Sequence, residues 1–272
     1  MNRKNLVVSG CSFTEGHILQ EKGSWATYLS EMMGLKLHNR AGGGMGNSYI
    51  STNVIGYFTQ YPELIDDSIV IIGWTEITRM LGTFMHQPPR GTEIVTIRPQ
   101  DFIDDDKKIG WSDGGFDSYH GYVVKHRDVL IPFFSTWNYA VYETYVAMLN
   151  LKNFLELHKI PYLFFDAIAD SKVVINDSKL LLRSTWIDIE LDEYIDPDGH
   201  MSCILNQKVI DKIFNDDRWI SFYGKSMCIH MNSDPLKEEK YTRGNSGHPN
   251  EYAANYFAKI ILNEYERLYN KR

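Results

Sequence analysis

Residues 69–73 read Ile-Val-Ile-Ile-Gly, an apolar run without the polar alternation that a half-buried strand shows. Such a run is typical of a strand in a parallel sheet, where helices cover both faces. Similar runs occur at residues 5–9 (NLVVS) and 162–168 (YLFFDAI). The sequence therefore predicts a parallel sheet that is buried on both sides.

Segments with helical periodicity alternate with these runs. The longest covers residues 137–158, where apolar residues recur every three or four positions. Further helices are predicted at 24–33, 48–60, 203–214 and 250–269, and shorter strands at 36–39 and 218–222. This alternation predicts a single α/β domain over residues 1–272, with an open parallel sheet between two layers of helices.

Charge and composition exclude several classes of partner. The chain has 35 acidic and 28 basic residues and no long Lys/Arg block, so no nucleic-acid surface is indicated. No apolar run approaches the roughly 20 residues of a membrane span, and the apolar strand begins too early to leave room for a signal peptide. The 3 scattered cysteines fit reduced thiols. We therefore expect a cytoplasmic protein with a small-molecule or glycan partner and no membrane partner; the oligomeric state is not indicated.

Parallel α/β sheets bind ligands beyond the carboxyl ends of their strands. The loops that follow residues 5–9, 36–39 and 69–73 contain Ser12, the glycines at 42–44 and the segment 73–76. His248 lies just before the last predicted helix. We expect these residues to converge at one edge of the sheet.

The side chains of these loops suit nucleophilic catalysis. A serine hydroxyl needs a base, most often histidine, so Ser12 and His248 are candidates for nucleophile and base. The N–H of Ser12 and one from the glycines could receive an oxyanion. Each residue also has a simpler interpretation, in which Ser12, Thr75 and His248 only cap helices or turns and the glycines only form a turn.

Four stretches, SGCSFTEG, NRAGGGMGN, IIGWTE and NSGHPN, resemble the signature blocks of the SGNH hydrolases, or GDSL-like esterases and lipases, in the expected order. The resemblance implies a three-layer, flavodoxin-like α/β/α fold with about five parallel strands. It also implies hydrolysis of esters, often acetyl groups on carbohydrates, through an acyl-serine and without a cofactor. By position, Ser12 is the nucleophile, Gly43 or Gly44 the oxyanion glycine, and His248 the base.

The resemblance has two departures. Thr75 stands where the third block has the oxyanion-hole asparagine; its hydroxyl can donate one hydrogen bond, and Asn47 is an alternative donor. Asn245 stands where the last block has an aspartate, and an amide can orient an imidazole without stabilising its charge. Asp234 is an alternative acid for His248.

The sequence therefore predicts a serine esterase or deacylase that acts on a small ester or O-acyl group, such as an O-acetyl group on a carbohydrate. The alternative is an SGNH-like binding protein with weakened catalysis, or an acyltransferase.

Residues 80–135 are too long for a simple connection and are expected to form an insertion over the active site. Its aromatic residues could act as a wall for a sugar or acyl chain, so Trp111 and Tyr119, together with Trp74 from the third loop, are predicted to contact the substrate. The alternative is that these aromatics pack within the insertion or in a subunit contact. Asp196, Asp198 and His200 could be metal ligands, but a surface turn is favoured, and no metal is predicted.

Overall fold

The fold is given by a computed structural model. It describes residues 3–16, 23–77, 80–85, 92–97, 137–169, 171–172, 174–176, 179–183, 188–191, 207–233 and 248–270.

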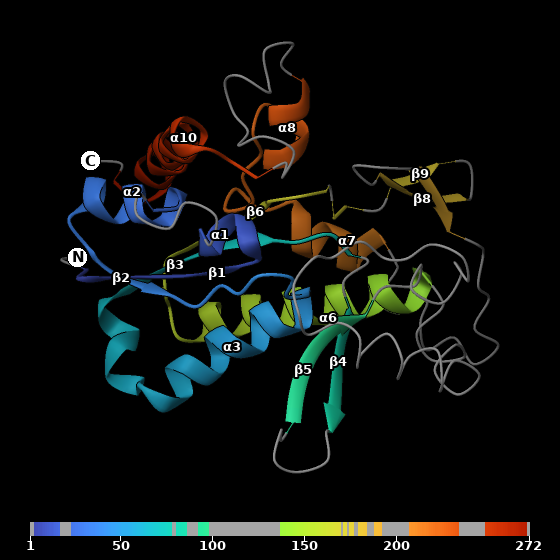
Figure 1. Ribbon diagram of the computed structural model, residues 1–272, viewed down its shortest axis with the longest axis horizontal. Helices are drawn as coiled ribbons and strands as arrows, with labels where there is room; N and C mark the ends of the chain where they lie inside the picture. Colours follow the sequence, from blue (N-terminus) through green and yellow to red (C-terminus); the bar gives the residue numbers. More distant parts are fainter. Residues whose placement is uncertain are drawn as a thin grey trace.

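The centre of the molecule is a parallel sheet flanked by helices (Figure 1). Its strands are β2 (Lys36–Asn39), β1 (Asn5–Gly10), β3 (Ser68–Trp74) and β6 (Tyr162–Asp166), in that order across the sheet. All three pairings are parallel. This is the flavodoxin-like order, and it confirms the predicted three-layer α/β/α class.

The predicted strand at 218–222 is reduced to a single bridge. Trp219 pairs in parallel with Phe164 of β6, and the N–H of Ile220 and the C=O of Arg218 both bond to Phe164, each at 2.8 Å. The chain then turns, because the N–H and C=O groups of Phe222 and Lys225 bond to each other. The chain therefore occupies a fifth position in the sheet, beside β6, but only through this single bridge.

Helices cover the sheet on both faces. On one face lie α2 (Trp25–Met33), α8 (Met227–Ser233) and α10 (Glu251–Tyr269), whose apolar side chains pack on Leu6, Ile71 and Phe165. The other face carries α3 (Asn47–Gln60), α6 (Trp137–Leu157) and α7 (Gln207–Phe214), which pack on the alternate strand residues Val7, Ile72 and Phe164. Because alternate residues of a strand point to opposite faces, strands covered on both sides consist of continuous apolar runs.

The structure also describes several shorter elements. They are the one-turn helix α1 (Ser12–Glu15), the 3-10 helix η2 (Pro62–Asp67), the antiparallel pair β4 (Met80–Met85) and β5 (Thr92–Ile97), and the antiparallel strands β7 (Val174–Asn176), β8 (Lys179–Arg183) and β9 (Asp188–Leu191). The pair β4 and β5 is the only described part of the expected insertion, and the rest lies outside the described residues. Among the described helices, none has the length and apolarity that a membrane crossing requires.

Candidate active site

Ser12 is held in a sharp turn at the carboxyl end of β1. The carbonyl of Cys11 accepts from the N–H groups of Thr14 at 2.9 Å and Glu15 at 3.0 Å, which closes α1 directly after the strand. The turn ends at Gly16, whose φ of 78° is the left-handed conformation that glycine adopts without strain. Ser12 is thus the first residue of α1, and its N–H has no acceptor among the described residues. Its hydroxyl caps nothing, so the simple interpretation as a turn cap does not account for it.

Two glycines allow α1 to lie this close to the sheet. Gly10 and Gly73 are neighbours in register on β1 and β3. A Cβ on Gly10 would stand 2.2 Å from Thr14 Oγ1 and 2.8 Å from the carbonyl oxygen of Gly73. A side chain at position 10 would therefore displace α1, and Ser12 with it.

The glycine loop after β2 lies against the same end of β1. The N–H of Gly42 donates to the carbonyl of Gly10 at 3.1 Å, and Gly44 has a φ of 74°. Asn39 connects this loop to α1, because its Nδ2 donates to the carbonyl of Thr14 at 3.3 Å and its Oδ1 accepts from the N–H of Ala41 at 3.0 Å. The predicted oxyanion glycine Gly43 is therefore on a loop tied directly to the helix that carries Ser12.

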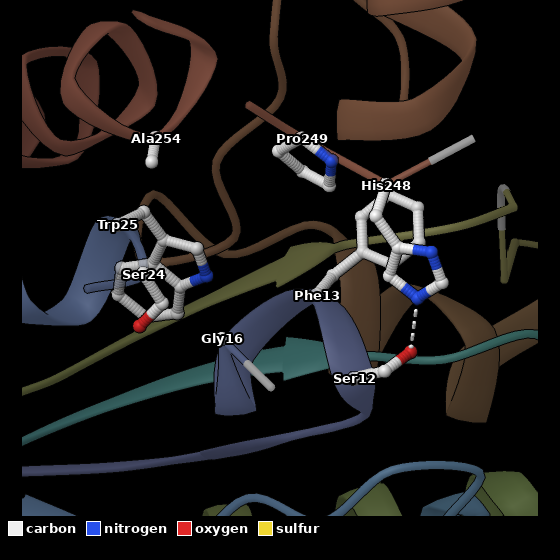
Figure 2. A pocket seen from close by; sticks show the side chains of 8 residues that line it. All are labelled: Ser12, Phe13, Gly16, Ser24, Trp25, His248, Pro249 and Ala254. Carbon is white, nitrogen blue, oxygen red and sulfur yellow. Dashed lines mark hydrogen bonds between the residues drawn. The ribbon is translucent and has the colours of Figure 1, made fainter. Parts of the chain in front are cut away.

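His248 reaches Ser12 from the other end of the chain. Its Nε2 lies 2.9 Å from Ser12 Oγ, within hydrogen-bond distance, across 236 residues of sequence (Figure 2). The ring of Phe13 packs against the imidazole with centroids 5.1 Å apart. Asn250, two residues after His248, caps α10 by accepting from the N–H of Ala253 at 2.9 Å, which fixes the start of the helix that follows. The pair has the geometry of a nucleophile and its base.

Asn47 is not the oxyanion donor that the sequence suggested. It is fully buried, and its Nδ2 donates to the carbonyl of Thr75 at 3.2 Å and to Thr144 Oγ1 at 3.3 Å. Both hydrogens of the amide are therefore in use. Thr75 is different: it is also buried, but its hydroxyl has no partner in the described part of the chain. The role predicted for the Thr75 hydroxyl stays open to test.

Trp74 does not line the site either. The last residue of β3 is fully buried, and its ring packs edge-on against Phe164 in the core on the α3 and α6 side, with centroids 5.3 Å apart. Its predicted contact with the substrate is wrong because strand alternation directs the side chain into the core. The other predicted contacts and histidine partners (Trp111, Tyr119, Asn245 and Asp234) lie outside the described residues.

A narrow pocket begins at Ser12 and His248. Its volume is about 10 Å³, close to what one water molecule needs, and Figure 2 shows the side chains that surround it. Phe13, Trp25 and Ala254 supply apolar walls. The indole Nε1 of Trp25 and the hydroxyl of Ser24 are buried without a partner among the described residues.

Sequence reasoning missed Phe13, Trp25 and Ser24 as parts of this site. Phe13 directly follows the predicted nucleophile, which was a usable signal, whereas Trp25 and Ser24 open a helix that carries no sign of the contact. No group of His, Cys, Asp and Glu side chains that could hold a metal ion occurs in the described ranges. The possible ligands Asp196, Asp198 and His200 lie outside those ranges.

Comparisons with known proteins give little further information. No family model matches the chain, and no curated protein matches it. Among solved structures, it is similar to the psychrotrophic esterase EstA from Pseudoalteromonas sp. inhibited by monoethylphosphonate, with 10% sequence identity and a TM-score of 0.48. The match covers 98% of this chain and 100% of the esterase chain. At this TM-score the likeness carries no argument about the site.

Proposed function

We propose that the protein is a serine esterase or deacylase that hydrolyses a small ester or O-acyl group through an acyl-serine intermediate. One observation carries the proposal, namely the 2.9 Å approach of His248 Nε2 to Ser12 Oγ at the carboxyl end of β1. The order of Ser12, the glycine loop, Thr75 and His248, which resembles that of the SGNH hydrolases, supports it.

In the first half of the reaction, His248 Nε2 takes the hydroxyl proton as Ser12 Oγ attacks the ester carbonyl. The resulting oxyanion needs donors that are already in position. The N–H groups of Ser12 and Gly43 suit this role, because neither has an acceptor among the described residues. The imidazolium of His248 then protonates the leaving alkoxide, and the acyl group stays on Ser12.

In the second half, His248 takes a proton from water as the water oxygen attacks the acyl carbon. Collapse of this second tetrahedral intermediate returns the proton to Ser12 Oγ and releases the carboxylic acid. The narrow pocket beside Ser12, lined by Phe13 and Trp25, favours a small acyl group over a long chain. An O-acetyl group, such as one on a carbohydrate, is therefore the proposed acyl group.

Hydrolysis of p-nitrophenyl acetate and butyrate by the purified protein tests the proposal. We expect Ser12→Ala and His248→Ala each to lower kcat/KM by at least about 10³-fold, and the double variant to lose little more, because the two residues act as a unit. Acetate should be preferred to butyrate. A fluorophosphonate should label the parent at Ser12, as peptide mass spectrometry would show.

Matched controls come from similar residues elsewhere on the surface. Ser233→Ala, on α8, and His158→Ala, just after α6, should keep the parent rate. If Ser12→Ala and His248→Ala turn over as fast as these controls, and Ser12 takes no label, the esterase proposal is wrong and a binding role replaces it.

A further inference from the structure

A large cleft lies at the amino ends of the strands, opposite the candidate active site. Its volume is about 570 Å³, within the usual range for small-molecule sites. It lies beside residues that precede β1 and β6 and beside the last turns of α10, whereas Ser12 follows the far end of β1. Figure 1 shows α1 at that far end of β1, away from the two chain termini. The cleft therefore shares no residue with the serine–histidine pair.

The cleft gathers positive charge on a protein that is negative overall. Arg3, Lys159 and Arg218 line it, and Glu156 is the only acidic residue among its described lining residues. The chain as a whole has a formal charge of −7. A local excess of cations on such a chain favours an anionic ligand.

Several donors in the cleft remain available. Arg218 uses Nε and Nη2 on Asp216 and Glu156, while its Nη1 has no acceptor within the described residues. The ammonium of Lys159 and the hydroxyl of Tyr265 likewise have no hydrogen-bond partner within the described residues. Hydrogen bonds from charged donors to an anion are among the strong ones in proteins.

Lys159 occupies a backbone position where glycine is the usual residue. After α6, the N–H of Lys159 bonds to the carbonyl of Glu156 and the N–H of Ile160 to that of Leu155, which is the Schellman ending of a helix. Lys159 is the left-handed residue of that ending, with a φ of 53°. A lysine held in this strained conformation at the rim of a cationic cleft indicates a use for its charge.

We propose that this cleft binds the phosphate group of a small phosphorylated molecule. A guanidinium N–H pair, an ammonium and a phenol can serve the three terminal oxygens of a phosphate monoester, and the lining side chains carry a formal excess of two positive charges over Glu156. The ring of Tyr269, 5.0 Å from that of Tyr265, supplies an apolar wall for the rest of the ligand.

Calorimetric titration of the full chain tests this, with ribose 5-phosphate and adenosine monophosphate as probes and with ribose and adenosine as uncharged counterparts. We expect saturable binding of the phosphorylated probes only. Lys159→Ala should weaken that binding about tenfold, the effect of one charge-assisted hydrogen bond. Inorganic phosphate shows whether the phosphate group alone is enough or the organic part adds affinity.

Two further variants separate binding from folding. Lys159→Gly should weaken the binding of the phosphorylated probes as much as Lys159→Ala does. It should also raise the Tm by about 2 °C, because glycine adopts the left-handed backbone conformation without strain. Lys259→Ala removes an exposed lysine of α10 that does not line the cleft, and it should leave binding unchanged. No binding below roughly 10 mM, or equal affinity in Lys159→Ala and Lys259→Ala, would overturn the proposal.

Discussion

The side chain of Asn47 holds Thr75 through both of its backbone groups. Oδ1 of Asn47 accepts from the N–H of Thr75 at 3.0 Å, and Nδ2 donates to the carbonyl of Thr75 at 3.2 Å. The first turn of α3 thereby fixes the end of β3, where the chain leaves the sheet. With these two hydrogen bonds made, the hydroxyl is the one polar group of Thr75 without a partner in the described chain.

The Thr75 hydroxyl gives a prediction with opposite effects on rate and stability. Thr75→Val keeps the shape and removes the buried, unpaired hydroxyl, so the free energy of unfolding should rise by about 1 kcal/mol. If the hydroxyl contributes to the oxyanion hole, kcat for p-nitrophenyl acetate should fall roughly 10- to 100-fold. Urea unfolding and initial rates on the same preparation measure both effects.

Thr75→Ser is the matched control, because it keeps the hydroxyl and loses only the methyl group. It should retain most of the activity. An unchanged kcat in Thr75→Val would exclude the hydroxyl from the oxyanion hole, whatever happens to stability.

Asn39 is expected to act as a positioning residue. Asn39→Asp has the same shape but loses the Nδ2 donors that reach the carbonyls of Thr14 at 3.3 Å and Glu15 at 3.4 Å. The glycine loop should then shift relative to Ser12 and lower kcat about tenfold, with KM little changed. Asn153→Asp, which changes an exposed asparagine of α6, should have no effect on kcat, and equal rates in the two variants would contradict the prediction.

His38 should make stability depend on pH. Its Nε2 lies 3.0 Å from Asn5 Oδ1, and the hydroxyl of Tyr57 donates to Nδ1 at 2.7 Å. Burial, and then the positive charges of Lys36 and Arg40, lower the pKa of His38 below 6.5. The unfolded chain therefore binds a proton at His38 more readily than the folded chain does. The stability that the neutral His38 contributes is complete above pH 6.5, and it is lost as the pH falls through the folded pKa.

Urea unfolding at a series of pH values from 8 to 5 measures this effect. The parent should lose free energy of unfolding below pH 6.5, and His38→Gln should lose less over the same interval. His158→Gln, which changes an exposed histidine at the end of α6, should follow the parent curve. If the curve of His38→Gln also matches that of the parent, the lowered pKa is not the cause.

The sequence was most informative where burial alone decides the structure. The apolar runs of β1, β3 and β6 predicted a sheet covered on both faces, and the periodicity of residues 137–158 predicted α6 almost to the residue. The one-turn helix α1 was missed, because four residues are too few to show a period. Residues 218–222 became a single bridge, because the turn at Phe222–Lys225 decides where the pairing stops.

In the site, errors came from residues at the ends of elements. Trp74 was assigned to a loop, although it continues the alternation of Val70 and Ile72 into the core. Asn47 was also taken for a loop residue, but it begins α3 and points at β3. The side chain of an end residue is directed by the element to which it belongs, and sequence reasoning locates element boundaries least well.

The separation of Ser12 and His248 by 236 residues also has a consequence for synthesis on the ribosome. The strands β1, β2, β3 and β6 are all complete by Asp166, so the described sheet can assemble while the C-terminal part of the chain is still being made. A nascent chain at that stage carries the serine without its base. Under the proposed mechanism, the growing polypeptide could not hydrolyse its substrate until His248 has been made and α10 has docked.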